Sequence, residues 1–242
     1  MHGSKHFLFS SQQRSLKKKI GWRLVDFLAK RFHSIVLLNE ATGVEWKHKN
    51  ITVIPNFIGS DLVATPIPHS KSIIAIGRVV AEKGYVRMLQ IFESIHAKHP
   101  DWSLHIFGDL KDVAFYNSLR AQPHESVYFY GESKAVFAEI EKADFLIHTS
   151  FHEGFSLVVA EALALGRPVV AFDVPFILNR LIQDESTGFL VKDGDVKQFE
   201  YRMLSLIEQP ELLVEMGEKA SVSLQAFDIK EVLKKWVCFF ES

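Results

Sequence analysis

The sequence predicts an α/β fold in which helices cover both faces of a parallel sheet of about six strands. From residue 72 onward, short apolar runs alternate with segments that have the apolar period of a helix, which is typical of βαβ units. Three of these runs end on glycine, at Gly77, Gly108 and Gly131, where the backbone can turn tightly or approach a ligand. Residues 143–172 have the order strand, polar loop, helix and strand, as expected for one crossover of a parallel sheet.

The composition excludes several classes of protein. The 242 residues, 48% of them hydrophobic, suffice for one large domain or for one domain and part of another. A net charge of −1 argues against a general nucleic-acid binder. A single cysteine, Cys238, excludes an internal disulfide framework. No apolar run approaches the roughly 18 residues of a membrane span, and residues 1–11 lack the features of a secretory signal. We therefore expect a cytoplasmic protein.

The first 60 residues differ from the remainder in charge. They contain ten Lys or Arg and three Asp or Glu, whereas residues 61–242 contain 18 basic and 26 acidic residues. A polar, Pro-rich stretch follows at 63–70, and such a composition marks a linker. We therefore expect a domain boundary near residue 60.

Before the linker we expect one helix and two strands. Residues 14–31 carry apolar side chains at three- and four-residue spacing, and their basic residues include Arg14 and Arg31 at the two ends. A basic amphipathic helix can lie on an anionic membrane surface, which would make the protein peripheral to the membrane. It can equally be a packed surface helix with solvated charges, and both alternatives remain open. The short apolar runs 34–38 and 51–54 are expected strands.

After the linker, expected strands and helices alternate without interruption. We expect strands at residues 73–76, 103–107, 127–130, 145–148, 169–172 and 189–191. We expect helices at residues 84–99, 112–121, 134–142, 156–165 and 176–183, and through most of 196–240. Gly166 and Pro168 end the fourth of these helices.

The stretch around that fourth helix carries two glutamates. Glu153 lies in the loop before the helix, and Glu161 lies in its second turn. In open parallel sheets, ligands bind beyond the carboxyl ends of the strands and against helix N-termini. We therefore expect both glutamates to border such a site. The free backbone N–H groups of Gly154, Phe155 and Ser156 would point at a bound anion.

A second charged loop follows the first strand of the alternating series. Gly77, Arg78 and Lys83 precede the start of a helix. A guanidinium can bind phosphate oxygens at two points, and an ammonium acts as a mobile point charge. The spacing also fits a solvated loop whose cations contact only water. The phosphate role gains support if two strands of the sheet end at one crevice, because this loop would then face Glu153.

Other common sites are absent from the sequence or have simpler explanations. No glycine-rich dinucleotide fingerprint and no P-loop follows any expected strand, which argues against an oxidoreductase or nucleotidase of those classes. Asp193 and Asp195 resemble a metal-binding pair, but Asp195 directly precedes a helix and is expected to be its N-cap. No spacing of histidine or cysteine indicates a metal site. We expect Cys238 to be a small buried residue of an amphipathic terminal helix.

Three motifs occur in a fixed order: Gly77-Arg78-x4-Lys83-Gly84, Glu153-Gly-Phe-Ser-Leu-Val-Val-Ala-Glu161-Ala and Gly166-Arg-Pro168-Val-Val. Together they resemble the family 4 retaining glycosyltransferases of GT-B fold, and the similarity covers residues 34–225. The combination is specific because it joins the glutamate pair, the glycines and the Arg/Lys element in the same order. The resemblance implies a Rossmann-like domain that binds the sugar donor.

The resemblance also implies a nucleotide diphosphate sugar donor, UDP-linked, and a glycan or lipid-linked acceptor. Arg78 and Lys83 would hold the donor diphosphate. Glu153 would face hydroxyls of the donor sugar, and Glu161 would bind the ribose hydroxyls. Further donor contacts are implied for Gly77, Gly131, Gly154, Phe155, Ser156 and Leu157. Members of this family need no metal, so no cofactor is expected.

Length is the largest departure from the family. A GT-B enzyme has two Rossmann-like domains, and this chain resembles the donor-binding one with only the tail of the other. The implied parts are an acceptor-side remnant at 1–60, a donor-binding domain at 61–225 and a helix at 226–242 that would cross back to the missing domain. The acceptor side would then belong to another polypeptide or be lost. The alternative function is a truncated, non-catalytic nucleotide-sugar-binding or assembly module.

Overall fold

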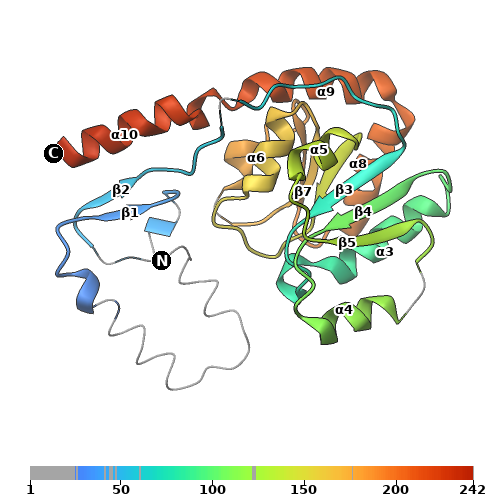
Figure 1. Cartoon of the computed structure of the whole chain (residues 1–242), viewed down its shortest axis with the longest axis horizontal. Coiled ribbons are helices and arrows are strands. Elements are labelled where there is room, and N and C mark those ends of the chain that lie inside the picture. Colours follow the sequence, from blue (N-terminus) through green and yellow to red (C-terminus); the bar gives the residue numbers. More distant parts are fainter. Residues whose placement is uncertain are drawn as a thin grey trace.

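A parallel sheet of six strands forms the centre of the molecule (Figure 1). The computed structural model describes residues 25, 27–40, 42–43, 46, 48–59, 61–121, 124–175 and 177–241. The strands of this sheet are β3 (Ser72–Ile76), β4 (Ser103–Phe107), β5 (Val127–Gly131), β6 (Phe145–His148), β7 (Val169–Asp173) and β8 (Gly188–Lys192). Their order across the sheet is β5-β4-β3-β6-β7-β8, and all neighbours are parallel. The predicted fold class is confirmed.

The order of the strands changes direction at β3. The chain proceeds from β3 to β4 and β5 on one side, and then returns to place β6 on the other side of β3. β3 and β6 pair directly, with Ile73 opposite Phe145 and Ile74 opposite Leu146. In open α/β sheets, ligands bind beyond the carboxyl ends of the strands at such a reversal. The loops that follow β3 and β6 therefore flank the expected position of a ligand.

The central strands are buried on both faces because apolar side chains occupy nearly every position. Phe145, Leu146 and Ile147 of β6 are at most 1% exposed. A continuous apolar pattern of this kind is typical of a parallel strand between two helical layers. The edge strand β5 differs, because Tyr128 and Tyr130 are exposed. The core therefore lies around β3, β6 and β7.

Helices lie on both faces of the sheet (Figure 1). They are α3 (Tyr85–His96), α4 (Val113–Arg120), α5 (Val136–Glu141), α6 (Leu157–Ala164), α7 (Leu178–Leu181), α8 (Val196–Glu208) and α9 (Pro210–Ser223). α3 packs against α8, and α9 packs against α6 and α8. The carboxylate of Asp195 accepts a hydrogen bond from the backbone N–H of Gln198 at 3.0 Å. Asp195 is thus the N-cap of α8, as predicted.

A small parallel sheet of two strands, β1 (Ile35–Leu37) and β2 (Ile51–Val53), lies beside the main body (Figure 1). Between β2 and β3, Ile58 forms a parallel bridge with Asp228. The backbone N–H of Ile58 also donates to the carbonyl of Phe227 at 2.8 Å. This bridge joins the segment after β2 to the start of α10 (Ile229–Glu241), which extends away from the six-stranded sheet.

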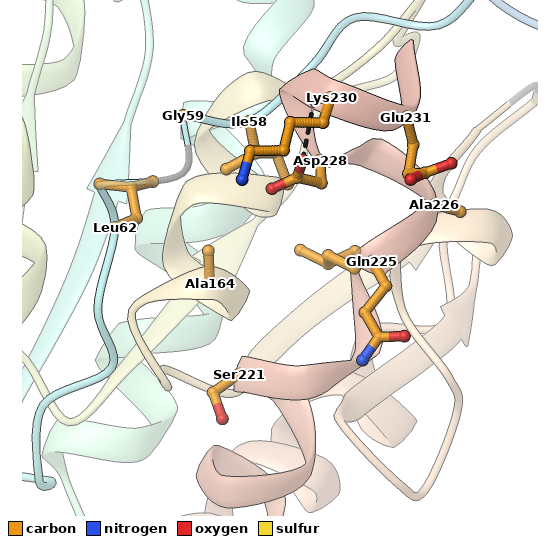
Figure 2. A pocket seen from close by; sticks show the side chains of 11 residues that line it. Ile58, Gly59, Leu62, Ala164, Ser221, Gln225, Ala226, Asp228, Lys230 and Glu231 are labelled. Carbon is orange, nitrogen blue, oxygen red and sulfur yellow. Dashed lines mark hydrogen bonds between the residues drawn. The ribbon is translucent and has the colours of Figure 1, made fainter. Parts of the chain in front are cut away.

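A cavity of about 590 Å³ lies beside this bridge (Figure 2). Its walls come from the segment after β2, the end of α6 and the junction of α9 and α10, and the labelled residues include Ile58, Leu62, Ala164, Ser221 and Asp228. The predicted site residues 153–157 lie at the opposite end of α6, which spans about 12 Å, and Glu161 lies about one turn before Ala164. No predicted site residue lines this cavity. It is therefore separate from the expected ligand position.

Two of the expected helices are either shorter in the structure or largely outside the described residues. The helix expected at 176–183 is shorter, since α7 ends at Leu181 and Ile182 is extended, with φ −98° and ψ 119°; residue 176 lies outside the described residues. The helix expected at 14–31 also lies largely outside them, and of its described residues, 25 and 27–29 are helical. Every helix in the described part of the chain is too short or too polar to span a bilayer.

The expectation that Cys238 is buried is wrong. Cys238 is exposed, and so are Leu233, Val237 and Phe240 on the same helix, while Val232 is buried. The amphipathic pattern of α10 does predict a helix with an apolar side. Among the described residues, however, little covers that side, because α10 extends away from the sheet (Figure 1).

Candidate functional site

The loops after β3 and β6 contact each other where the strand order reverses. The backbone N–H of Phe151 donates to the carbonyl of Glu82 at 3.0 Å. The hydroxyl of Thr149 lies 3.1 Å from the carbonyl oxygens of both Lys83 and Gly84. At Gly84, which has a φ of 70°, a Cβ atom would lie 2.1 Å from the carbonyl oxygen of Thr149. Glycine is therefore required at this position for the two loops to meet.

Lys83 and Glu153 form an ion pair between these loops. The Nζ atom of Lys83 is 2.6 Å from Oε1 of Glu153. The side chain of Glu153 is 8% exposed and that of Lys83 is 24% exposed, so the pair is largely withdrawn from water, where opposite charges attract more strongly than at the surface. The structure thus brings two of the predicted site residues into direct contact.

His148, the last residue of β6, is a third member of this cluster. Its Nε2 atom lies 2.8 Å from the same Oε1 atom of Glu153, and its side chain is 6% exposed. Burial alone would raise the pKa of Glu153. The hydrogen bond and charge of His148, followed by the charge and hydrogen bond of Lys83, instead hold that pKa well below its usual range. Glu153 is therefore an ionised carboxylate with two partners on one oxygen.

Sequence reasoning missed His148. It stood within the strand expected at 145–148, and an isolated histidine in a strand is more often a core residue than a functional one. The signal that could have identified it is its position. It is the last residue of a buried strand, and Glu153 follows five residues later in the loop that this strand leads into.

Arg87, which sequence reasoning also missed, fixes the loop after β6. Its guanidinium donates to the carbonyls of Thr149 and Ser150, both at 2.8 Å. It also forms an ion pair with Asp193 at 2.6 Å. The rings of Phe151 and Phe172 lie 4.0 and 4.1 Å from its central carbon, a favourable cation–π arrangement. Burial lowers the pKa of Arg87, and the hydrogen bond and charge of Asp193 oppose this shift. This arginine holds the loop that carries Glu153.

Glycines bring the carboxyl ends of β3, β4 and β5 close together. The N–H of Gly108 donates to the carbonyl of Gly131 at 2.7 Å, and a Cβ atom on Gly108 would lie 1.9 Å from the carbonyl oxygen of Gly77. The hydroxyl of Tyr85 donates to the Gly77 carbonyl at 2.7 Å, and burial raises the pKa of Tyr85. Gly77 and Gly131 therefore lie along one edge of the sheet, and their contact with a ligand stays a prediction.

The start of α6 faces the same edge. Ser156 is its N-cap but makes no side-chain capping hydrogen bond, which leaves the first backbone N–H groups available to an anion. Phe155 is buried and packs edge-to-face against Phe227, with ring centroids 5.5 Å apart. The carbonyl of Gly154 accepts a hydrogen bond from the side-chain amide of Asn39 at 2.9 Å. A residue from the part before the linker therefore also holds this loop.

Leu157, Glu161 and Arg78 complete the predicted set. Leu157 is 44% exposed in the first turn of α6. Glu161 lies in the second turn, and burial raises its pKa. Arg78 is exposed in the loop directly after Gly77. Within the described residues, neither the side chain of Glu161 nor that of Arg78 makes a hydrogen bond or ion pair, so each side chain is available to a ligand. The role of each predicted site residue stays a prediction.

The charged side chains of this site do not form a metal centre of their own. Among the residues that the structure describes, no group of three or more His, Cys, Asp or Glu side chains is arranged to hold a metal ion. The arrangement instead combines two cations, a helix N-terminus and two carboxylates. Cations and N–H groups suit an anion such as a diphosphate, and carboxylates suit hydroxyl groups.

Known glycosyl transferases resemble this chain in sequence. The family described as "Glycosyl transferases group 1" matches residues 64–222. An uncharacterized glycosyltransferase of Haemophilus influenzae is 26% identical over 240 residues, which cover 96% of this chain and 67% of the relative. The poly(ribitol-phosphate) alpha-N-acetylglucosaminyltransferase of Staphylococcus aureus is 24% identical over 221 residues. Those residues cover 88% of this chain but only 45% of that relative.

Solved structures share the fold. A point mutant of S. aureus TarM, in complex with Fondaparinux, alpha-GlcNAc-glycerol and UDP, aligns with a TM-score of 0.86 and 23% identity over 100% of this chain and 50% of its own. HepE of Anabaena, in complex with UDP-glucose, aligns with a TM-score of 0.82 and 19% identity, over 93% of this chain and 68% of its own. The family match covers the main sheet together with both loops of the site. The chain therefore belongs to the group 1 glycosyl transferases.

Proposed function

We propose that this chain is the donor-binding part of a family 4 retaining glycosyltransferase. Its donor would be a nucleotide diphosphate hexose, UDP-linked, and its acceptor a glycan or lipid-linked glycan. The proposal rests on the contact between Lys83 and Glu153 where the strand order reverses. This contact lies beside the start of α6, whose first N–H groups have no side-chain cap. The UDP present in the TarM and HepE complexes supports the choice of nucleotide.

In this proposal the cations and the helix N-terminus stabilise the departing diphosphate. Lys83 and Arg78 neutralise the negative charge that grows on the leaving group, and the N–H groups of Ser156 and Leu157 add fixed dipoles. Such preorganised electrostatic stabilisation is the largest single contribution in many enzymes. Because these groups already supply positive charge, we propose that transfer needs no metal ion.

The carboxylates recognise the two sugars of the donor. Glu161 would accept hydrogen bonds from the ribose hydroxyls, and its half-buried position in α6 makes those bonds stronger than at the surface. Glu153 would face hydroxyls of the transferred sugar. The nucleobase would lie beside Gly131 at the end of β5, where φ is 77° and a Cβ atom would meet only the side chain of Leu110.

The chain spans 67% and 45% of the length of the two relatives compared above. We propose that the acceptor is bound mainly by a further domain, with the part before residue 60 as its edge. Asn39 would then link that domain, through Gly154, to the loop after β6.

Calorimetry with UDP, GDP and ADP, followed by the corresponding sugar nucleotides, tests the donor assignment. We expect UDP to bind and UDP-hexose to bind more tightly than UDP. The absence of binding by every nucleotide would contradict the proposal. Hydrolysis or transfer of the bound sugar supports an enzyme, whereas tight binding without turnover supports the alternative of a non-catalytic nucleotide-sugar-binding module.

A further inference from the structure

In the structure, the ammonium group that is proposed to bind the donor already has a partner. Oε1 of Glu153 lies 2.6 Å from Nζ of Lys83 and 2.8 Å from Nε2 of His148. A diphosphate that recruits Lys83 must therefore compete with Glu153 for it. If Lys83 leaves, Glu153 remains as a buried carboxylate, and a buried charge without a partner is strongly unfavourable.

The two partners of Glu153 differ in their freedom to move. Lys83 lies in the turn η2 (Ala81–Lys83), its side chain is 24% exposed, and its stem is long and flexible. His148 ends a strand that is buried at every position, and its own side chain is 6% exposed. Lys83 can therefore reach toward a ligand, while the imidazole must stay where it is.

In the structure, Lys83 is the one other described side chain that shares Glu153 with His148. The guanidinium of Arg87 on α3 is occupied by Asp193 and by the carbonyls of Thr149 and Ser150, and Arg78, in the loop after β3, is assigned to the diphosphate in the proposed function. Among the described residues, Lys83 and His148 are the side chains that bond to Glu153. When Lys83 leaves, His148 alone remains.

We propose that His148 is a positioning residue that holds Glu153 in place while Lys83 transfers from Glu153 to the donor diphosphate. Glu153 then keeps one fixed partner, and its carboxylate stays oriented toward the sugar. His148 itself acts only through Glu153. The inference rests on the proposed function, because it assigns the diphosphate to Lys83.

A double-mutant cycle on the full chain tests this role, with UDP as the probe in calorimetry. His148→Leu removes the hydrogen bond, so Glu153 should retain Lys83 more tightly and UDP should bind about tenfold more weakly. His148→Gln retains an N–H donor at a similar reach, and its loss should stay below about threefold. Glu153→Gln frees Lys83, so UDP should bind at least as tightly as to the wild type.

The decisive comparison is His148→Leu in the Glu153→Gln background. There the leucine should change UDP affinity by less than about twofold, because no carboxylate remains to be held. An equal loss in both backgrounds would assign His148 a packing role and overturn the proposal, as would an unchanged affinity of His148→Leu alone. If the leucine variant does not fold by circular dichroism, His148→Asn, whose amide is shorter, takes its place in the same cycle.

The outcomes also separate this inference from the proposed function. A wild-type chain that binds none of UDP, GDP and ADP refutes the donor site itself. A wild-type chain that binds UDP, in a cycle without coupling between positions 148 and 153, refutes only the positioning role.

Discussion

At the scale of single residues, burial rather than distance distinguishes the charge pair of the site from those of the surface. Lys219 and Glu215 approach each other within 2.6 Å, as Lys83 and Glu153 do, but their side chains are 50% and 60% exposed. Exposed pairs contribute little because water and salt screen them. The Lys83 pair is mostly buried, so separating Lys83 from Glu153 costs free energy. A change in that cost should alter the affinity for a ligand that recruits Lys83.

The first residue-scale prediction concerns the cations. Arg78→Ala and Lys83→Ala should each weaken UDP binding by about tenfold or more, since each removes a charge-assisted hydrogen bond to phosphate. Uridine lacks phosphate, and its affinity should change by less than about threefold. Calorimetry with both ligands measures the difference. Equal losses for UDP and uridine would contradict the phosphate role, and Lys219→Ala on the surface is the matched control.

The second residue-scale prediction concerns Glu161 and pH. Burial raises its pKa in the folded chain, so the folded state favours the protonated form and is destabilised wherever this carboxyl is ionised. Glu161→Gln should therefore raise the melting temperature at neutral pH. The gain should shrink as the pH falls, because the wild-type carboxyl then takes up its proton.

Ligand binding gives the same substitution a second readout. Glu161→Gln should weaken uridine binding by about tenfold, because the amide is a poorer acceptor for ribose hydroxyls. Thermal unfolding followed by circular dichroism at several pH values, together with uridine titrations, measures both effects. A melting temperature that falls at neutral pH would show that Glu161 stabilises the fold rather than the ligand.

At the scale of elements, the sequence predicted every strand of the main sheet because parallel strands are continuous apolar runs bounded by polar loops. It also identified both loops of the site from Glu153 and Lys83. It missed Arg87 and Asn39 because their partners lie far along the chain: Arg87 is 62 positions from Thr149, and Asn39 is 115 positions from Gly154. It missed His148, whose partner Glu153 is five positions away, because an isolated histidine in an apolar strand resembles a core residue. Such contacts depend on the packing of the chain, which local periodicity does not encode.

The contact between the two loops gives the element-scale prediction. Gly84→Ala forces a side chain into a φ of 70° and within 2.1 Å of the Thr149 carbonyl oxygen, so we expect a loss of about 2–4 kcal/mol in the free energy of unfolding. Gly194 is a matched control, because its φ is 84° but a Cβ atom there meets nothing within 4 Å. Gly194→Ala should cost only about 1 kcal/mol.

Urea unfolding of both variants measures this difference. A similar cost for the two substitutions would show that backbone strain alone matters and that the loops do not need to approach so closely. A larger cost at Gly84, accompanied by weaker UDP binding, would link the closeness of the loops to the site.

At the scale of the whole molecule, two contacts join the loop after β6 to segments outside the six-stranded sheet, and a third contact joins those segments to each other. Asn39 bonds to Gly154, Phe155 packs against Phe227, and Ile58 pairs with Asp228 at the start of α10. The loop after β6 is therefore connected to the segments that lie outside the six-stranded sheet (Figure 1). A ligand that moves this loop would therefore also displace the junction that leads into α10.

Cys238 can report whether the apolar side of α10 is covered. Because it is the one cysteine in the sequence, labelling with a thiol reagent reports on α10 alone, and Cys238→Ser supplies the blank. The thiol is exposed beside Val237, so the folded chain should react about as fast as the chain in denaturant. The orientation of α10 makes this outcome informative, since the sequence pattern alone places the same residue in a core.

A protected thiol would mean that residues outside the described part, or a second copy of the chain, cover the apolar side of α10. Repeating the measurement over a range of protein concentrations separates those two causes, because only a second copy makes the protection depend on concentration.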